Sequence, residues 1–536
     1  MSAQRGQAVI LTCMVILVIA ALGNSLLNYG LNASRLAQRQ QLQEETFYLA
    51  EGAVEDGISR FSQAIANFQI DANAPRYPAV GVLTTTFANG ATASSVVTEA
   101  EPTQRTVPDP DGINLFVKNY RVRTTVRHPS NPGITVTLNQ VVARRLLAPF
   151  QHAVFYDADL EWLPGADMTL AGRIHSNANM YLGTGALLTV DSEYVRAAGK
   201  IFNRRKDNNT VPSGTVQIRQ AGTVTYVAMA GLDSTSPTWT TASQTRWNGT
   251  VKSDVHGVTK RAIPVVGSTA PGGYYHTQAD VRIINGTITD KNGNPLPVPA
   301  GTIQTTTTCY NQREKKTIRM TEIDLKKLAG YLPGDPPGIP SGTNFLPANG
   351  LIYATRNDAP ATQEPGVRLI NGSEIRRAGG LAVVSNDPVY IKGDFNTVTK
   401  KPVAVIADAL NILSNSWNDA NSAGAISARV ASLTTVNGAF IAGITPTPTG
   451  GGTYSGGFEN YPRLQENWTN KQLIISGSFV SLWNSQIATG NWPGTGRVYN
   501  APTRLWSWNA SFGSGTTLPP FSPFAVEIVK GAWWKE

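Results

Sequence analysis

The chain has 536 residues, of which only 15% are charged, and it contains 50 glycines and 33 prolines. This composition favours strands and turns over helices, and the length suggests about three domains. The net charge is +9, but the basic runs at 204–206 and 313–316 are too short to specify nucleic acid, so we interpret them as solvated surface and expect no nucleic-acid partner.

The chain opens with an apolar segment in which the fifteen residues from Ala8 to Leu22 carry no charge. Weaker apolar character continues to Leu31, and about 20 apolar residues span a bilayer as a helix. Three interpretations are open. The segment is a membrane anchor, a secretory signal peptide cut near residues 21–23, or the first part of a helix that stays in the mature protein.

A helical pattern continues beyond this segment. Apolar residues recur at steps of seven, four, three, four and three residues, which places on one helix face Phe47, Val54, Ile58, Phe61, Ile65 and Phe68. Acidic residues such as Glu51 and Glu55 fall mostly off that face, as a solvated or partner-facing side requires. The sequence therefore predicts one helix over residues 7–70, apolar at its start and amphipathic at its end.

The segments RGQAVILTCMVILVIAALG and LAEGAVEDGISRF resemble the N-terminus of type IV pilins, in particular large minor pilins and K-type minor pseudopilins of type IV pilus and type II secretion machinery. The resemblance implies a short leader, residues 1–6, that a prepilin peptidase removes between Gly6 and Gln7. It also implies that the helix anchors the subunit in the bacterial inner membrane and later packs with the helices of other pilin-like subunits. The residues expected on this membrane and filament surface are Leu11, Val15, Ile16, Ile19 and Leu22.

Two positions depart from the usual pilin pattern. Pilins have Phe at the first mature position and Glu at the fifth, whereas this chain has Gln7 and Leu11. A buried Glu is stabilised by a neighbour's terminal amine, so a subunit without it needs no neighbour ahead of it. In this respect the chain resembles tip-type minor subunits, and we expect it at a filament tip. An uncleaved anchor and a removed signal peptide stay open as alternatives.

Residues 75–150 show the pattern of antiparallel strands. Asn89-Gly90 separates two runs rich in Thr and Val, which is a strong hairpin signal. Apolar and polar residues alternate over 120–127, and a second hairpin is expected at 129–133. We predict a four-stranded antiparallel sheet on the second half of the helix, with a solvated face that carries Arg121, Arg123 and Arg127.

The pattern of the remaining residues is typical of a β-solenoid or a β-sandwich. Short apolar runs broken by Gly and Asn recur in 151–332 and 351–536, about every 20 to 35 residues, as in a parallel β-helix. In the first region the apolar positions are Leu170, Ile174, Met180, Leu182, Leu188, Val190, Val195 and Ile201. The proline-rich segment 333–350 is expected to link the two regions, and a short helix is expected from Thr321. The predicted fold class is therefore α+β and mostly β: a long pilin-like helix on an antiparallel sheet, followed by solenoid-like regions.

The sequence offers no pattern for a catalytic, cofactor or metal site. The five histidines lack metal-ligand spacing, and His175 is the first of them to inspect. Four aspartates recur near expected solenoid corners, where such residues usually cap turns: Asp387, Asp394, Asp408 and Asp419. Cys13 and Cys309 lie far apart, so we expect no disulfide.

Tryptophans gather after residue 400, and they favour either a cap on the open end of the solenoid or, together with Arg463, Arg497 and Arg504, a surface that stacks sugars or bases. The candidate ligand-binding residues are Trp468, Trp483, Trp492, Trp506 and Trp508. We therefore expect a non-enzymatic minor pilin or pseudopilin, first in the inner membrane and then in a periplasmic or extracellular filament. The alternatives are a cell-surface adhesin or glycan-binding module and, third, a β-helix carbohydrate-active enzyme.

Overall fold

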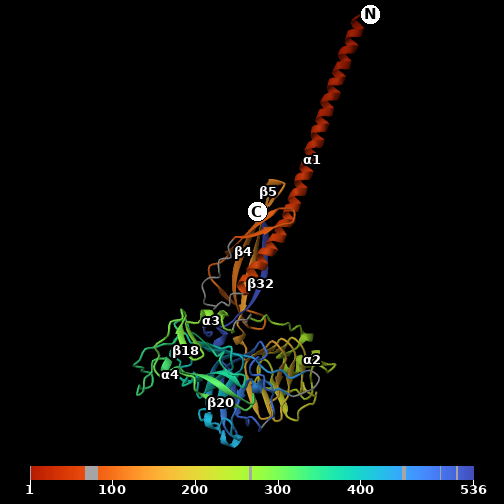
Figure 1. Ribbon diagram of the computed structural model, residues 1–536. Helices are drawn as coiled ribbons and strands as arrows, with labels where there is room; N and C mark the ends of the chain where they lie inside the picture. Colours follow the sequence, from red (N-terminus) through yellow and green to blue (C-terminus); the bar gives the residue numbers. More distant parts are fainter. Residues whose placement is uncertain (1, 67–81, 265–268, 449–453, 495, 515–516) are drawn as a thin grey trace.

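The structure is a computed structural model that describes residues 2–66, 82–264, 269–448, 454–494, 496–514 and 517–536. Strands dominate, and the longest helix, α1 (Ser2–Ala66), comes first. Figure 1 shows the first half of α1 projecting alone, a stalk in which its second half lies beside a sheet, and a broad head beyond the stalk. The fold class is α+β and mostly β, as the sequence predicts.

The stalk sheet is antiparallel and contains six strands. Its order is β1-β2-β4-β5-β32, and β3 pairs with β4 outside this path. The strands are β1 (Leu83–Thr86), β2 (Thr92–Glu99), β3 (Arg105–Pro108), β4 (Asn114–His128), β5 (Asn131–Leu147) and β32 (Ala525–Lys535). Both predicted hairpins are confirmed. The prediction of four strands is wrong, since it misses the short β3 and cannot see β32, which comes from the other end of the chain.

The predicted apolar face of α1 is buried on this sheet. Its core residues are Val54, Ile58 and Phe61, with Phe47 partly buried beside them. Gly57 lets the helix approach the sheet closely, because a Cβ there would lie 3.2 Å from Cγ1 of Val122. The side chain of Ile65 and the whole of Phe68 lie outside the described residues. On β4 the alternate side chains are exposed, as predicted, for Arg121, Arg123 and Arg127.

The head begins with three short coils of parallel strands. Equivalent residues pair in register, as Val154 does with Ile174 and Ile174 with Val195, 20 and 21 residues apart. The coils are β6 (Val154–Tyr156), β7 (Leu160–Trp162) and β8 (Met168–Ala171); β9 (Ile174–Ser176), β10 (Met180–Leu182) and β11 (Leu187–Asp191); β12 (Val195–Ala197), β13 (Ile201–Phe202) and β14 (Thr215–Arg219). Each coil covers the inward apolar residues of the one before it, which is the source of stability in a solenoid.

A second stack of parallel strands has two long faces. One face contains β17 (Val281–Ile284), β22 (Leu351–Thr355), β24 (Leu381–Val384), β26 (Val403–Ala407), β28 (Thr434–Ala442), β30 (Gln472–Ser481) and β31 (Thr503–Trp508). The other contains β21 (Lys316–Asp324), β23 (Gln363–Ile370), β25 (Val389–Lys392), β27 (Leu410–Leu413) and β29 (Pro462–Leu464). This arrangement of parallel strands agrees with the solenoid-like recurrence of short apolar runs in the sequence.

Smaller elements complete the head. The strands are β15 (Tyr226–Ala228), β16 (Val251–Lys252), β18 (Thr287–Asp290), β19 (Ile303–Gln304) and β20 (Thr308–Asn311), and the helices are α2 (Trp239–Trp247), α3 (Tyr274–Gln278) and α4 (Leu325–Leu328). Single 3-10 turns are η1 (Pro149–Gln151), η2 (Asp254–His256), η3 (Asp419–Asn421), η4 (Ile426–Ala428), η5 (Phe458–Asn460) and η6 (Ala510–Gly513). The predicted helix start at Thr321 is wrong, because β21 continues to Asp324, whose carboxylate accepts from the Lys327 N–H (3.0 Å) and caps α4.

The two stacks join in the middle of the head. β30 pairs with β31 along its first residues and with β6 along its last, and β31 pairs with β8, so a single 16-stranded sheet runs through both stacks. The chain enters the head at this junction, winds out to α2, crosses to β17 and β18 at the opposite end, and winds back (Figure 1). The sequence places a linker at 333–350 between two β regions, whereas this sheet takes strands from both.

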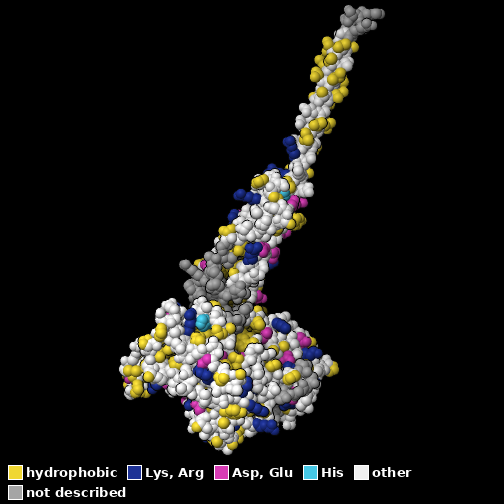
Figure 2. Space-filling model, in the orientation of Figure 1, with side chains coloured by type: hydrophobic (Ala, Val, Ile, Leu, Met, Phe, Trp, Pro, Cys, Tyr) yellow, Lys and Arg dark blue, Asp and Glu magenta, His cyan; other side chains and the backbone are white. Residues whose placement is uncertain are grey.

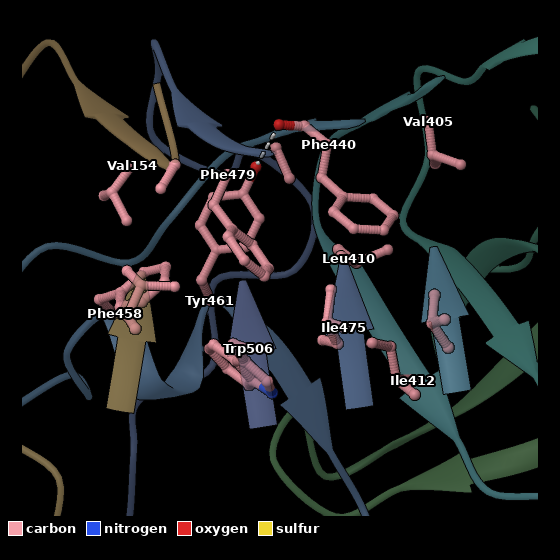
Figure 3. Packing of buried hydrophobic residues seen from close by; sticks show 14 of the residues in the cluster. Val154, Val405, Leu410, Ile412, Phe440, Phe458, Tyr461, Ile475, Phe479 and Trp506 are labelled. Carbon is pink, nitrogen blue, oxygen red and sulfur yellow. Dashed lines mark hydrogen bonds between the residues drawn. The ribbon is translucent and has the colours of Figure 1, made fainter. Parts of the chain in front are cut away.

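An aromatic cluster fills the junction (Figure 3). Phe479 of β30 stacks on Trp506 of β31 with ring centroids 5.1 Å apart, and Phe458 packs edge-on against both rings. The Tyr461 hydroxyl donates to the backbone oxygen of Phe440 (3.1 Å). Aromatic side chains bury large areas and pack in defined geometries, so this cluster fixes the two stacks against each other.

Candidate functional site

The first half of α1 is an apolar rod that the rest of the chain leaves uncovered. Figure 2 shows hydrophobic side chains along the face of it that is in view. The five residues predicted to face membrane or filament are 50–65% exposed: Leu11, Val15, Ile16, Ile19 and Leu22. An 18-residue window within Gly6–Ala64 has a mean hydropathy of 2.4, so the helix is long and apolar enough to cross a membrane. A signal sequence meets the same criteria. What distinguishes α1 is that it continues unbroken into the stalk.

The predicted cleavage position lies near the start of this rod. Gly6 and Gln7 are helical and exposed, and a Cβ built at Gly6 meets no atom within 4 Å. The peptide bond between them is therefore uncovered in the described chain. Leu11, the fifth residue after that bond, is equally open to an environment outside the subunit. Cleavage itself stays a prediction.

The five candidate tryptophans lie in different environments. Trp468, Trp492 and Trp506 are buried, while Trp483 and Trp508 are half-buried. The indole N–H of Trp508 donates to the backbone oxygen of Phe150 (2.9 Å). These five side chains form no shared stacking surface, and Trp506 fills the middle of the head instead of capping an end. Composition could not separate these cases, because buried and exposed tryptophans look alike in a sequence.

One of them, Trp492, lines a pocket of about 710 Å³ where the two stacks meet. We call this the aromatic pocket, and we define it by Tyr454, Trp492, Tyr499, Arg205, Glu459 and Arg504. The rings of Trp492 and Tyr499 lie 4.9 Å apart at 40°. The Arg205 guanidinium lies 4.6 Å from the ring centroid of Tyr454. Sequence reasoning named only Trp492 and Arg504 of these residues, since no spacing links them to Arg205 of the other stack.

Hydrogen bonds hold the polar groups of the aromatic pocket in place. The carboxylate of Glu459 accepts from the Tyr454 hydroxyl (2.8 Å) and from the Leu163 N–H (3.1 Å). Nη2 of Arg504 donates to the Tyr499 hydroxyl (3.2 Å) and to the backbone oxygen of Glu459 (3.1 Å). Burial raises the pKa of the Tyr454 and Tyr499 hydroxyls, so both stay protonated at neutral pH.

A second pocket, of about 400 Å³, lies at the joint between stalk and head. Arg261 of the head pairs with Asp109 (2.8 Å) and Asp111 (3.2 Å) in the loop between β3 and β4. His175 lines this pocket and is fully satisfied: Nε2 donates to Oδ1 of Asn177 (2.9 Å) and Nδ1 accepts from the Tyr194 hydroxyl (3.3 Å). Burial lowers the pKa of His175 to about 4, so the ring is neutral at neutral pH. Its hydrogen bonds to Asn177 and Tyr194 stabilise the joint between stalk and head.

Within the described residues no group of three or more His, Cys, Asp or Glu side chains is placed to hold a metal ion, and Cys13 and Cys309 are free thiols. The four corner aspartates are engaged in turns or ion pairs. Asp387 accepts from the Thr355 hydroxyl, Asp394 from the Thr435 N–H, Asp408 from the Ala488 N–H, and Asp419 pairs with Arg368.

Comparison with known proteins gives a weak likeness. No protein-family model and no curated protein matches the chain. Among solved structures, the competence-associated pilin ComZ from Thermus thermophilus aligns over 92% of this chain and 97% of its own, with 10% sequence identity and a TM-score of 0.28. A score of this size does not establish a shared fold, so the function is inferred below from this chain's own residues.

Proposed function

We propose that the chain is a non-enzymatic, membrane-anchored subunit of a type IV pilus or of a type II secretion-like filament. The continuity of α1 supports this most directly, since one helix carries an uncovered apolar half and a half packed on an antiparallel sheet. A signal peptide needs no such continuation into the folded protein. A contiguous apolar surface of this size requires lipid or other helices to cover it.

We propose that the subunit is first anchored in the membrane and then assembled into a filament. A prepilin peptidase removes residues 1–6, and α1 holds the subunit in the inner membrane with the stalk and head outside the cytoplasm. The same surface, with Leu11, Val15 and Ile16 on it, then packs against the helices of other pilin-like subunits in a filament. Each of these side chains gains about 1.5–3 kcal/mol when it is fully buried, in lipid or in a helix bundle.

We place the subunit at the filament tip. Leu11 stands where pilins carry the Glu that pairs with the terminal amine of a neighbour, so this subunit requires no subunit ahead of it. The shape of the head is compatible with that position. It lies across the end of the stalk, opposite the N-terminus, and is broader than the stalk (Figure 1).

Each segment of the chain has its own proposed role in this subunit. We assign 7–70 to anchor and filament core, 75–150 to a platform on that helix, and 151–332 and 351–536 to a head with the character of a β-helix, with 333–350 between them. The last region also returns β32 to the platform, where it pairs with β5.

The N-terminus of the purified native protein tests the first stage. We expect mass spectrometry to find Gln7 as the first residue. A protein that begins at Met1 would indicate an uncleaved anchor, and one that begins at Asn24 would indicate a removed signal peptide and would contradict the proposal.

A charged substitution in the apolar first half of α1 tests whether that half packs in the membrane and in the filament. Val15→Asp places a carboxylate at half-exposed Val15, which costs about 2.5–3.5 kcal/mol at the centre of a membrane helix. We expect this variant to be missing from sheared filaments and from the membrane fraction. Gln38→Glu, at an exposed position of α1 beyond the apolar half, is the matched control and is expected to assemble normally. Normal assembly of both variants would refute the role of the rod.

A second candidate function, a ligand-binding module at the cell surface, is favoured by the aromatic pocket and is compatible with the first. The third alternative, a β-helix carbohydrate-active enzyme, gains no support from the four corner aspartates, because turns and ion pairs already engage them.

A further inference from the structure

We propose that the aromatic pocket binds an acidic saccharide, namely a pyranose that carries a carboxylate. The inference rests on the proposed function only in placing the head outside the cytoplasm, where such sugars are found on surfaces. The pocket residues come from both stacks: Arg205 follows β13, and the others come from segments around η5 and before and within β31.

The size and walls of the pocket suit a sugar. Its volume of about 710 Å³ lies within the range of small-molecule sites, about 300–1,000 Å³. Tyr454, Trp492 and Tyr499 provide apolar walls, and aromatic faces pack well against the C–H face of a pyranose.

Two charged side chains of the pocket, Arg504 and Glu459, form no ion pair within the described residues. The Glu459 carboxylate accepts from Tyr454, Leu163 and Gly457, whereas part of the Arg504 guanidinium has no partner there, so the charges favour an anion. Arg205 is neutralised by Asp207 at 2.8 Å. Arg504 is only 2% exposed and, within the described residues, has no carboxylate within ion-pair distance. Its Nε and Nη1 also lack hydrogen-bond partners there, and the Trp506 ring, 5.7 Å from the guanidinium carbon, compensates the charge only in part. A buried and unpaired guanidinium is costly, and a carboxylate is the group that pairs with it best.

The remaining polar groups fit the hydroxyls of the same ligand. Glu459 is held by Tyr454 and Leu163, so its carboxylate is oriented and retains lone pairs that can accept from sugar O–H groups. Asn460 lines the pocket as well. Stacking, one unpaired cation and oriented acceptors together define a sugar with an acidic group, and a neutral sugar would leave Arg504 unpaired.

Calorimetry on the full-length protein in detergent tests this. The probes are trigalacturonate, its neutral counterpart galactotriose, adenosine monophosphate and inorganic phosphate. We expect binding of trigalacturonate that weakens with added salt, and binding of galactotriose about 10- to 100-fold weaker, the range of a charge-assisted hydrogen bond. Equal binding of the neutral trisaccharide, a preference for adenosine monophosphate or phosphate, or no binding of any probe would overturn the proposal.

Variants locate the site. Arg504→Gln and Trp492→Phe are each expected to weaken trigalacturonate binding at least about tenfold, while Arg497→Gln, at an exposed arginine outside the pocket, is expected to leave it unchanged. Circular dichroism checks that each variant is folded. If Arg504→Gln unfolds the head, Trp492→Phe decides the matter, and unchanged affinity in that variant would refute the site. Val15→Asp should bind trigalacturonate normally, so failure of filament assembly and failure of this inference are distinguishable.

Discussion

Replacing Phe61 tests whether the second half of α1 and the stalk sheet form one unit. Phe61 is buried, and its ring lies 4.9 Å from the ring of Tyr120 on β4. Truncation of a buried Phe to Ala costs about 3–5 kcal/mol, which corresponds to about two to four orders of magnitude in an opening equilibrium. The loss should fall on the stalk, because Phe61 belongs to the cluster between α1, β2, β4 and β5 and not to the head clusters.

Hydrogen exchange measured by mass spectrometry resolves this locally. In Phe61→Ala, amides of β2 and β4 should exchange faster by that factor, while the head strands β24 and β26 should keep the exchange rates of the parent. Tyr48→Ala, at an exposed position of the same helix, is the matched control and should leave β2 and β4 protected. If Phe61→Ala and Tyr48→Ala exchange alike, the helix does not hold the sheet as described.

Two further predictions concern buried charges in the head. Arg463 and Glu314 form an ion pair in which each side chain is 2% exposed. Arg463→Met leaves the Glu314 charge buried and unpaired, so it should lower the free energy of unfolding by about 3–5 kcal/mol in thermal denaturation, and Arg463→Met/Glu314→Gln should recover part of that loss. An unchanged melting temperature in the single variant would contradict the pairing. Burial raises the pKa of Glu466 to about 7 from an ordinary value of 4.5. Between these two pH values the folded protein binds more protons than the unfolded chain. The free energy of unfolding therefore falls as pH rises, by up to about 1.4 kcal/mol per pH unit. Melting temperatures between pH 5 and 7 should therefore decline less steeply in Glu466→Gln than in the parent, and parallel curves would show that Glu466 does not titrate in this range.

Local patterns in the sequence predicted the parts of the fold that depend on neighbouring residues. The helical spacing from Phe47 to Phe61 and the strand alternation around Val122 each report one buried face, and both faces meet in the stalk core. The apolar positions chosen in the first head region, from Leu170 to Ile201, are buried because solenoid coils repeat every 20 or 21 residues there. Periodicity of this kind survives in a single sequence.

Pairings between distant segments could not be predicted in this way. β31 pairs with β8 through Arg504 and Met168, and β32 pairs with β5 through Ala525 and Leu147, with hundreds of residues between the partners. No turn or spacing marks such contacts. The aromatic pocket was missed for the same reason, because Arg205 meets the other pocket residues only after the two stacks have joined.

The paired exit of β5 and β32 from the stalk has a mechanical consequence. Leu147 and Ala525 are partners in the ladder, so both covalent connections to the head leave the stalk side by side. A pull on the head is therefore shared between two long antiparallel strands that run along the stalk, and separating them from their neighbours requires many hydrogen bonds to shear together. A subunit built in this way carries tension from a held surface to its anchoring rod without first unwinding the solenoid.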